Sequence, residues 1–185
     1  MIYGELGVHP LSIDIKTRMI NYWAKLSFNS GGKVCSHIYR LINCIFSSSY
    51  HTFHSKWLFC IKRILDDCGF SNIFDAQRNI NILWLKLSVK RRLTDHFIQT
   101  WNSDVFNSPK GISYRIFKQD WKFEDYLDKL GKKDRVTFCR FRTTNHHLPI
   151  ETGRWNSVNR ENRKCTLCNC DDLGMNFIIY LIVLL

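Results

Sequence analysis

Three cysteines near the end of the sequence have the residue types and part of the spacing of a metal site. Cys165 and Cys168 form a Cys-x-x-Cys pair in KCTLCNC, and Cys170 follows two residues later. Two cysteines at this spacing supply half of the four ligands that a structural zinc ion requires. No histidine or cysteine follows Cys170. We therefore expect an incomplete site that holds no zinc tightly, and we expect no other cofactor.

Other donors for this metal shell are distant or scattered along the sequence. His146 and His147 could complete it in principle, but residues 149–164 lie between. The remaining cysteines sit among apolar neighbours without metal-ligand spacing, and we expect reduced thiols that behave as small hydrophobic residues. They are Cys35, Cys44, Cys60, Cys68 and Cys139. No signal peptide opens the chain, so we expect an intracellular protein of the nucleus or cytoplasm.

Acidic residues could hold catalytic metal ions, but their context argues against it. Adjacent aspartates occur only at Asp66–Asp67, where we expect a helix to end before Gly69, and at Asp171–Asp172, in a predicted loop. Neither pair is flanked by hydrophobic strands, as a two-metal polymerase site requires. No glycine-rich phosphate loop, HExxH or GxSxG sequence is present. The sequence therefore predicts a chain without catalytic activity.

Positive charge is concentrated in the last third of the chain. The 185 residues carry 27 Lys and Arg against 16 Asp and Glu, a net charge of +11. Residues 131–164 alone contain nine basic and three acidic residues, an excess of six. Such a surface attracts polyanions, and we expect RNA or DNA as the partner. The predicted contact residues are Arg140, Arg142, Arg154, Trp155, Arg160, Arg163 and Lys164.

These residues also have simpler interpretations. Arginines bind phosphates in a forked geometry, and an exposed aromatic residue such as Trp155 can stack on a base. A basic segment can equally be a solvated surface, and aromatic residues can belong to the core. We assign Phe138 and Phe141 to the core.

The elements that must position these groups are predicted to be helices, because most apolar residues recur with a helical period. Apolar residues recur at three- and four-residue steps in LSIDIKTRMINYWAKLSF, and Val34, Ile38, Leu41, Ile42 and Ile45 mark one face of the next helix. A third helix ends at Gly69, which suits a left-handed cap. A longer helix is predicted from residue 79 to 105. We therefore predict a mainly α protein, a bundle-like array of five to seven helices with a short irregular, cysteine-containing C-terminal segment.

Turn signals divide this array into three parts. Asn107, Ser108, Pro109 and Gly111 mark a boundary after the long helix. The sequence predicts a helical region at 1–106, a basic helix and loop region at 107–164, and a truncated zinc-knuckle-like tail at 165–185. The tail ends in FIIYLIVLL, nine apolar residues, which is too short to span a bilayer alone.

Several segments of the sequence resemble a known family. FKQDWKFEDYLDKL, RVTFCRFRTTNHHLPIETGRW and RENRKCTLC resemble the region downstream of the reverse transcriptase domain in polyproteins of non-LTR (LINE-type) retrotransposons. The opening GELGVHPLSIDIKTRMINYWAKL is similar to a preceding block of the same elements. In that family a histidine and a further cysteine follow the Cys-x-x-Cys pair. Here those positions fall near Ile178 and Val183, so the resemblance implies a degenerate zinc knuckle.

The resemblance implies a non-catalytic C-terminal fragment of a retrotransposon reverse transcriptase polyprotein with residual, weakly specific nucleic-acid binding. Two other functions remain open from the residues alone. One is a basic helical interaction module whose charges only keep it soluble. The other is a peripheral membrane-surface protein, in which the basic face and apolar tail would favour anionic lipid.

Overall fold

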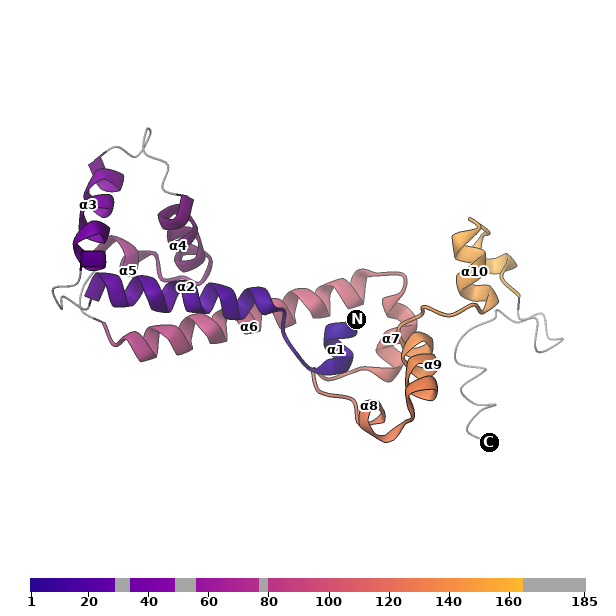
Figure 1. The fold of residues 1–185 in the computed structure, drawn as a ribbon. Helices are drawn as coiled ribbons and strands as arrows, with labels where there is room; N and C mark the ends of the chain where they lie inside the picture. The colour runs from indigo at the N-terminus through magenta and orange to yellow at the C-terminus, as the bar shows by residue number, and fades with distance from the viewer. Residues whose placement is uncertain (29–33, 49–55, 77–79, 165–185) are drawn as a thin grey trace. The chain divides into compact units, whose positions relative to one another are not determined.

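The protein is helical throughout the part of the chain that the computed structural model describes, residues 1–28, 34–48, 56–76 and 80–164 (Figure 1). These ranges contain no strand, and an isolated antiparallel bridge joins Leu6 and Phe123. This confirms the predicted mainly α fold. The elements are α1 (Ile2–Leu6), α2 (Leu11–Phe28), α3 (Val34–Ser48), α4 (Lys56–Asp67), α5 (Ser71–Ala76), α6 (Ile82–Asn107), α7 (Gly111–Phe117), α8 (Tyr126–Lys129), α9 (Lys132–Arg142), α10 (Pro149–Trp155) and the 3-10 helix η1 (Arg160–Asn162).

The described residues thus form more helices than the five to seven predicted. The additional elements include α1, α5 and α10, each of seven residues or fewer. Helices this short contain too few apolar positions to show a period in the sequence. The predicted irregular segment, from Cys165 onward, lies outside the described residues. None of the described helices combines the length and the hydrophobicity that a bilayer crossing requires.

The chain separates into two compact units. The inserted unit consists of His9–Phe97, and the discontinuous unit consists of Met1–Val8 together with the chain from Ile98 onward. The division falls inside α6, before the boundary that the turn signals near Asn107 predict. Turn residues mark where the chain changes direction, whereas the last turns of α6 pack with α7, so this end of the helix belongs to the discontinuous unit.

The inserted unit is built around one apolar core from α2 to α6. Trp23 of α2 is fully buried; its ring stacks on Phe74 of α5, and its Nε1–H donates to the Tyr39 hydroxyl of α3 at 2.9 Å. Leu58, Ile61, Leu65, Leu85 and Val89 fill the space around them. At the surface, Lys90 of α6 forms an ion pair with Asp14 of α2 at 3.0 Å.

A glycine ends α4 as the sequence predicts. Gly69 has a φ of +78°, in the left-handed region that favours glycine. Its N–H donates to the carbonyl of Asp66, and the N–H of Phe70 donates to the carbonyl of Leu65. This pair of bonds is a Schellman motif, which satisfies carbonyls at the helix end. Asp66 and Asp67 lie exposed at this helix end, in agreement with their predicted place before Gly69.

The α3 helix has an apolar stripe on the side that faces solvent. Tyr39 and Ser36 are buried, and Val34, Ile38 and Leu41 are each at least half exposed. The periodicity therefore predicts the helix and its stripe, but it does not predict which side faces the core. That side is the one that carries Tyr39, not the stripe. The hydrogen bond with Trp23 explains this orientation, because it satisfies a polar group inside the core.

The discontinuous unit has a smaller apolar cluster and an N-terminal segment that pairs with residues 122–124. Trp101 of α6 makes edge contacts with the rings of Tyr114 and Trp121. Glu124 donates its N–H to the carbonyl of Glu5 at 3.0 Å. Gly7, with φ +61°, caps α1 where a Cβ would collide with the backbone of Phe123. A residue without a side chain is therefore required at this crossing.

Candidate nucleic-acid interface

A cluster of buried charges organises the region that contains the predicted basic site. The guanidinium of Arg142, at the end of α9, lies 3.0 Å from the Glu5 carboxylate and 3.0 Å from that of Glu124. Lys118, which is also buried, forms an ion pair with Glu124. Two carboxylates are thus balanced by two cations. We name these four residues, Glu5, Lys118, Glu124 and Arg142, the buried ion-pair cluster.

Aromatic rings surround this cluster and supply further hydrogen bonds. The Tyr126 hydroxyl donates to Glu5 Oε2 at 2.6 Å, and Arg142 Nη2 donates to the carbonyl of Phe117 at 3.2 Å. The Arg142 guanidinium also lies over the rings of Phe117, Tyr126 and Phe138, at 5.3 to 5.9 Å from their centroids. Buried ions tolerate removal from water only when such partners satisfy them. The cluster therefore meets the requirement for a stable buried ion group.

The same burial affects two tyrosines. Removal from solvent raises the pKa of Tyr126, and the hydrogen bond to Glu5 raises it further. Burial also raises the pKa of Tyr114, with the negative charge of Glu5 as the next cause. Both phenols therefore stay protonated well above the ordinary tyrosine range.

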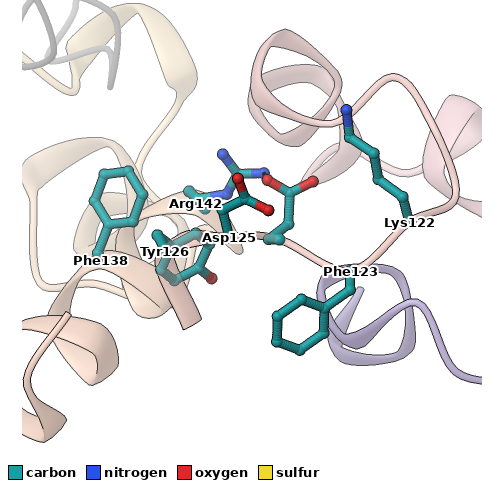
Figure 2. Close-up of a pocket in the computed structure, with 7 residues that line it drawn as sticks. Lys122, Phe123, Asp125, Tyr126, Phe138 and Arg142 are labelled. Carbon is teal, nitrogen blue, oxygen red and sulfur yellow. Dashed lines mark ion pairs between the residues drawn. The ribbon is translucent and has the colours of Figure 1, made fainter. Parts of the chain in front are cut away.

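A pocket of about 330 Å³ opens beside the cluster (Figure 2). Figure 2 shows the rings of Tyr126 and Phe138 together on one side of it and Lys122 and Phe123 on the other. Glu124 and Arg142, which also line it, form an ion pair with each other. Because these buried charges already satisfy one another, we interpret the cluster as a scaffold that fixes α9.

Arg142 therefore differs from its predicted role. Its side chain is 8% exposed and is held by Glu5 and Glu124, so it cannot reach a phosphate. The sequence places it near Arg140 in a basic segment, but the two residues point to different sides of α9. Arg142 belongs to the buried ion-pair cluster, and we remove it from the predicted contact set.

The outer face of α9 displays three basic residues of this helix. Arg140 is exposed, as predicted, and Lys132 and Lys133 are exposed on the same side. Arg135 is also exposed, but it lies seven residues before Arg142 and donates to the carbonyl of Leu130 at 3.0 Å. The inner face carries Phe138 and Phe141, which are half-buried. The ring of Phe138 meets Tyr126, and that of Phe141 meets Phe117. These contacts agree with a core assignment for both phenylalanines and leave the basic side of the helix in solvent.

Two predicted arginines on and near α10 have protein partners. Arg154 forms an ion pair with Glu151 at 2.7 Å, one turn earlier on the same helix. Arg163 donates to the carbonyls of Val158 and Ile150, and its side chain packs on Gly153. Arg154 and Arg163 therefore contribute to the structure of this segment, and their cationic groups are less accessible than that of Arg140.

The remaining predicted contacts lie at the surface. Arg160 and Lys164 are exposed, and Trp155 is about half exposed at 48%. The Trp155 ring meets the edge of His147, with centroids 5.5 Å apart. The role of Trp155 as a stacking platform stays a prediction, and its exposure is compatible with that role.

The predicted metal ligands cannot be placed. Cys165 and Cys168, with Cys170 and the positions near Ile178 and Val183, lie outside the described residues. Within the residues that the structure describes, no group of three or more His, Cys, Asp or Glu side chains could hold a metal ion. His146 Nδ1 accepts a hydrogen bond from the N–H of Leu148 at 3.2 Å.

Sequence reasoning missed the partners of Arg142. Glu5 and Arg142 are 137 positions apart, and no local pattern links them. The only sequence signal is the position of Arg142 beside the inward-facing Phe141 and Phe138, which brings its stem toward the core. Lys132 and Lys133 were counted in the basic segment, but they were not among the predicted contact residues.

Comparison with known proteins adds no family assignment, since no family model, curated protein or solved structure matches the chain.

Proposed function

We propose that this chain is the non-catalytic region that follows the polymerase in a non-LTR retrotransposon polyprotein, and that it binds RNA or DNA weakly and with little sequence preference. The family resemblance of residues 117–168 suggests the class. One structural observation carries the binding proposal: α9 is fixed by its inner face, and three of its basic residues lie exposed on the outer face. The proposed site uses Arg140, Lys132 and Lys133.

Charge placement supports phosphate contacts at this surface. Residues 131–164 hold an excess of six positive charges, and Glu151, one of the three acidic residues, is engaged with Arg154. Lysine and arginine side chains on a helix face neutralise phosphates and release counterions. The outer face of α9 therefore offers a stripe that can follow a nucleic-acid backbone.

The buried ion-pair cluster supports this surface from below. Arg142 and the ring contacts of Phe138 fix the rotation of α9, so that Lys133 and Arg140 stay in solvent. Trp155 offers one stacking surface, and no described element has the arrangement of a base-reading motif. The proposed binding consequently rests on phosphates and stacking, which are tolerant of sequence.

A salt titration with a matched control tests the proposal. The test variant is Lys133→Ala/Arg140→Ala, and the control is Arg18→Ala/Arg63→Ala, two exposed basic residues of the inserted unit. Both variants lose two positive charges. Binding of a fluorescent single-stranded RNA and a DNA duplex is measured by anisotropy over a range of salt concentrations, with anionic vesicles as a third ligand.

The slope of log affinity against log salt should fall by about two units in the α9 variant and stay near wild type in the control. Equal slopes in the two variants would show that only overall charge matters. Failure of the wild type to bind either nucleic acid at low salt would end the proposal. Binding to vesicles alone would favour the peripheral membrane alternative.

A further inference from the structure

The α3 helix carries a continuous apolar stripe that the inserted unit leaves in solvent. Val34 is 71% exposed, Ile38 50%, Leu41 65% and Ile45 46%. Their spacings of four, three and four residues place them along one line of the helix. The same spacing is the a and d pattern of a coiled-coil seam, with isoleucine at two a positions and leucine at a d position.

The core of the inserted unit fixes this orientation. Tyr39 and Ser36 point inward, on the opposite side of α3, and Tyr39 is bonded to Trp23. The Tyr39 ring also meets the edge of Trp57. If α3 were rotated so that the stripe faced inward, these contacts would be lost. None of the aliphatic residues of the stripe could replace Tyr39 as the hydrogen-bond partner of Trp23. The exposed stripe is therefore a consequence of how α3 is anchored.

The chemistry of the stripe selects its occupant. The chain has a net charge of +11, yet Arg40 is the only lysine, arginine or acidic residue in α3. A polyanion would gain little from so neutral a face. By contrast, the exposed Leu83 and Leu87 of α6 are followed by Arg91 on the same side of that helix. The α3 stripe fits an apolar helix of matching spacing.

We propose that the α3 stripe is a self-association surface and that its occupant is the α3 helix of a second copy of this chain. The seam is self-complementary, because the 4-3-4 spacing reads the same from either end. A two-fold contact requires such a surface, since the same patch must face itself. The neutral face also lets two basic chains approach without placing like charges together at the contact.

The size of the stripe sets the expected affinity. Four aliphatic side chains with about half or more of their surface exposed offer roughly 400 Å² per copy, so a pair would bury about 800 Å², below the ~1,200 Å² of stable complexes. The dimer should therefore be weak and form reversibly, with its fraction rising as the protein concentration rises. This proposal does not depend on nucleic-acid binding.

Sedimentation velocity of the full chain over a concentration range tests it. The test variant is Ile38→Lys/Leu41→Lys, and the matched control is Leu83→Lys/Leu87→Lys, a pair of similarly exposed residues of α6 in the same unit. Circular dichroism of each variant verifies that the helices are kept. Wild type and the α6 control should show the same monomer–dimer equilibrium, and the α3 variant should remain monomeric at concentrations at least tenfold higher.

Mixing two α3 variants tests the contact directly. Ile38→Glu/Leu41→Glu should be monomeric alone, and an equimolar mixture with the lysine variant should form dimers, because either helix orientation places lysine opposite glutamate. A wild type that stays monomeric throughout the range would overturn the proposal. It would also fail if the α6 control lost the dimer equally, or if a dimerising wild type gave variants that do not recombine.

Discussion

The two units of this protein differ in the kinds of side chain that they bury between their helices. The inserted unit uses an apolar core in which Trp23, Leu58 and Leu65 are fully buried. The discontinuous unit has a smaller apolar cluster and, in addition, an ion-pair cluster in which Glu5 and Arg142 are buried and Glu124 is largely covered. Apolar burial is non-directional and tolerates adjustment, whereas buried charges require specific partners. The difference predicts that the two units respond to different perturbations.

The largest expected effect comes from removing the central cation. Arg142→Met would leave the buried Glu5 without its cation and Glu124 with Lys118 alone, and should destabilise the discontinuous unit by about 3–5 kcal/mol. Hydrogen exchange should show lost protection in residues 111–142, with residues 58–65 unchanged. The control is Arg140→Met, an exposed residue of the same helix, for which we expect a change within about 0.5 kcal/mol. If both variants had equal effects, the buried charges would not be what distinguishes the discontinuous unit from the inserted unit.

A cavity in the inserted unit should have a comparable but more local effect. Leu65→Ala removes a fully buried side chain from α4 and should cost about 3 kcal/mol. Hydrogen exchange should then weaken in residues 58–74 and leave residues 126–142 protected. Leu87→Ala, at an exposed position of α6, is the control. Loss of protection in both units together would mean that they unfold as one.

A smaller effect is expected where α1 packs on the discontinuous unit. The Cβ of Gly4→Ala would overlap the ring of Trp101 and the hydroxyl of Tyr114, so the variant should lose about 1–3 kcal/mol by overpacking. Thermal unfolding followed by near-ultraviolet circular dichroism checks it. Gly131→Ala, which has only a distant side-chain neighbour, should be close to neutral. A neutral Gly4→Ala would indicate that α1 is held loosely.

The mildest test is alkaline pH. Tyr126 and Tyr114 have a pKa raised above the unfolded value of 10.0, so the folded state favours the protonated phenols. The stability that they contribute is fully present below pH 10 and is lost as the pH rises through the folded pKa. Protection in residues 111–142 should therefore fall at high pH before that in residues 58–65. Tyr126→Phe should reduce the difference; simultaneous loss in both units would contradict it.

Helix positions were predictable from the sequence, but the direction of their inward faces was less so. In α2, Ile15 and Tyr22 fit the apolar period yet are exposed, while Thr17 is buried. Thr17 can face inward because its hydroxyl donates to the carbonyl of Ile13, which removes the cost of burial. A pattern that counts only apolar residues cannot include such satisfied polar groups.

The candidate site was predictable only in part, for the same reason. The charge count finds the basic segment and Arg140, which local sequence is enough to place on a solvated helix face. The burial of Arg142 depends on Glu5, 137 positions earlier in the chain, and such a long-range partner leaves no local spacing to detect. The ion pair of Arg154 with Glu151 is different, because the two residues are three positions apart on α10, a spacing that the sequence already shows.

The pairing of residues 5–7 with residues 122–124 has a consequence for biosynthesis. The inserted unit is one continuous stretch of chain, His9–Phe97, so it can fold while the chain is still being made. In the discontinuous unit, the ion pair between Glu5 and Arg142 cannot form until residue 142 has left the ribosome. Until then the Glu5 carboxylate is exposed to water. Contacts between residues so far apart in the sequence form slowly during folding. We therefore expect the inserted unit to fold first and residues 5–7 to pair with residues 122–124 later.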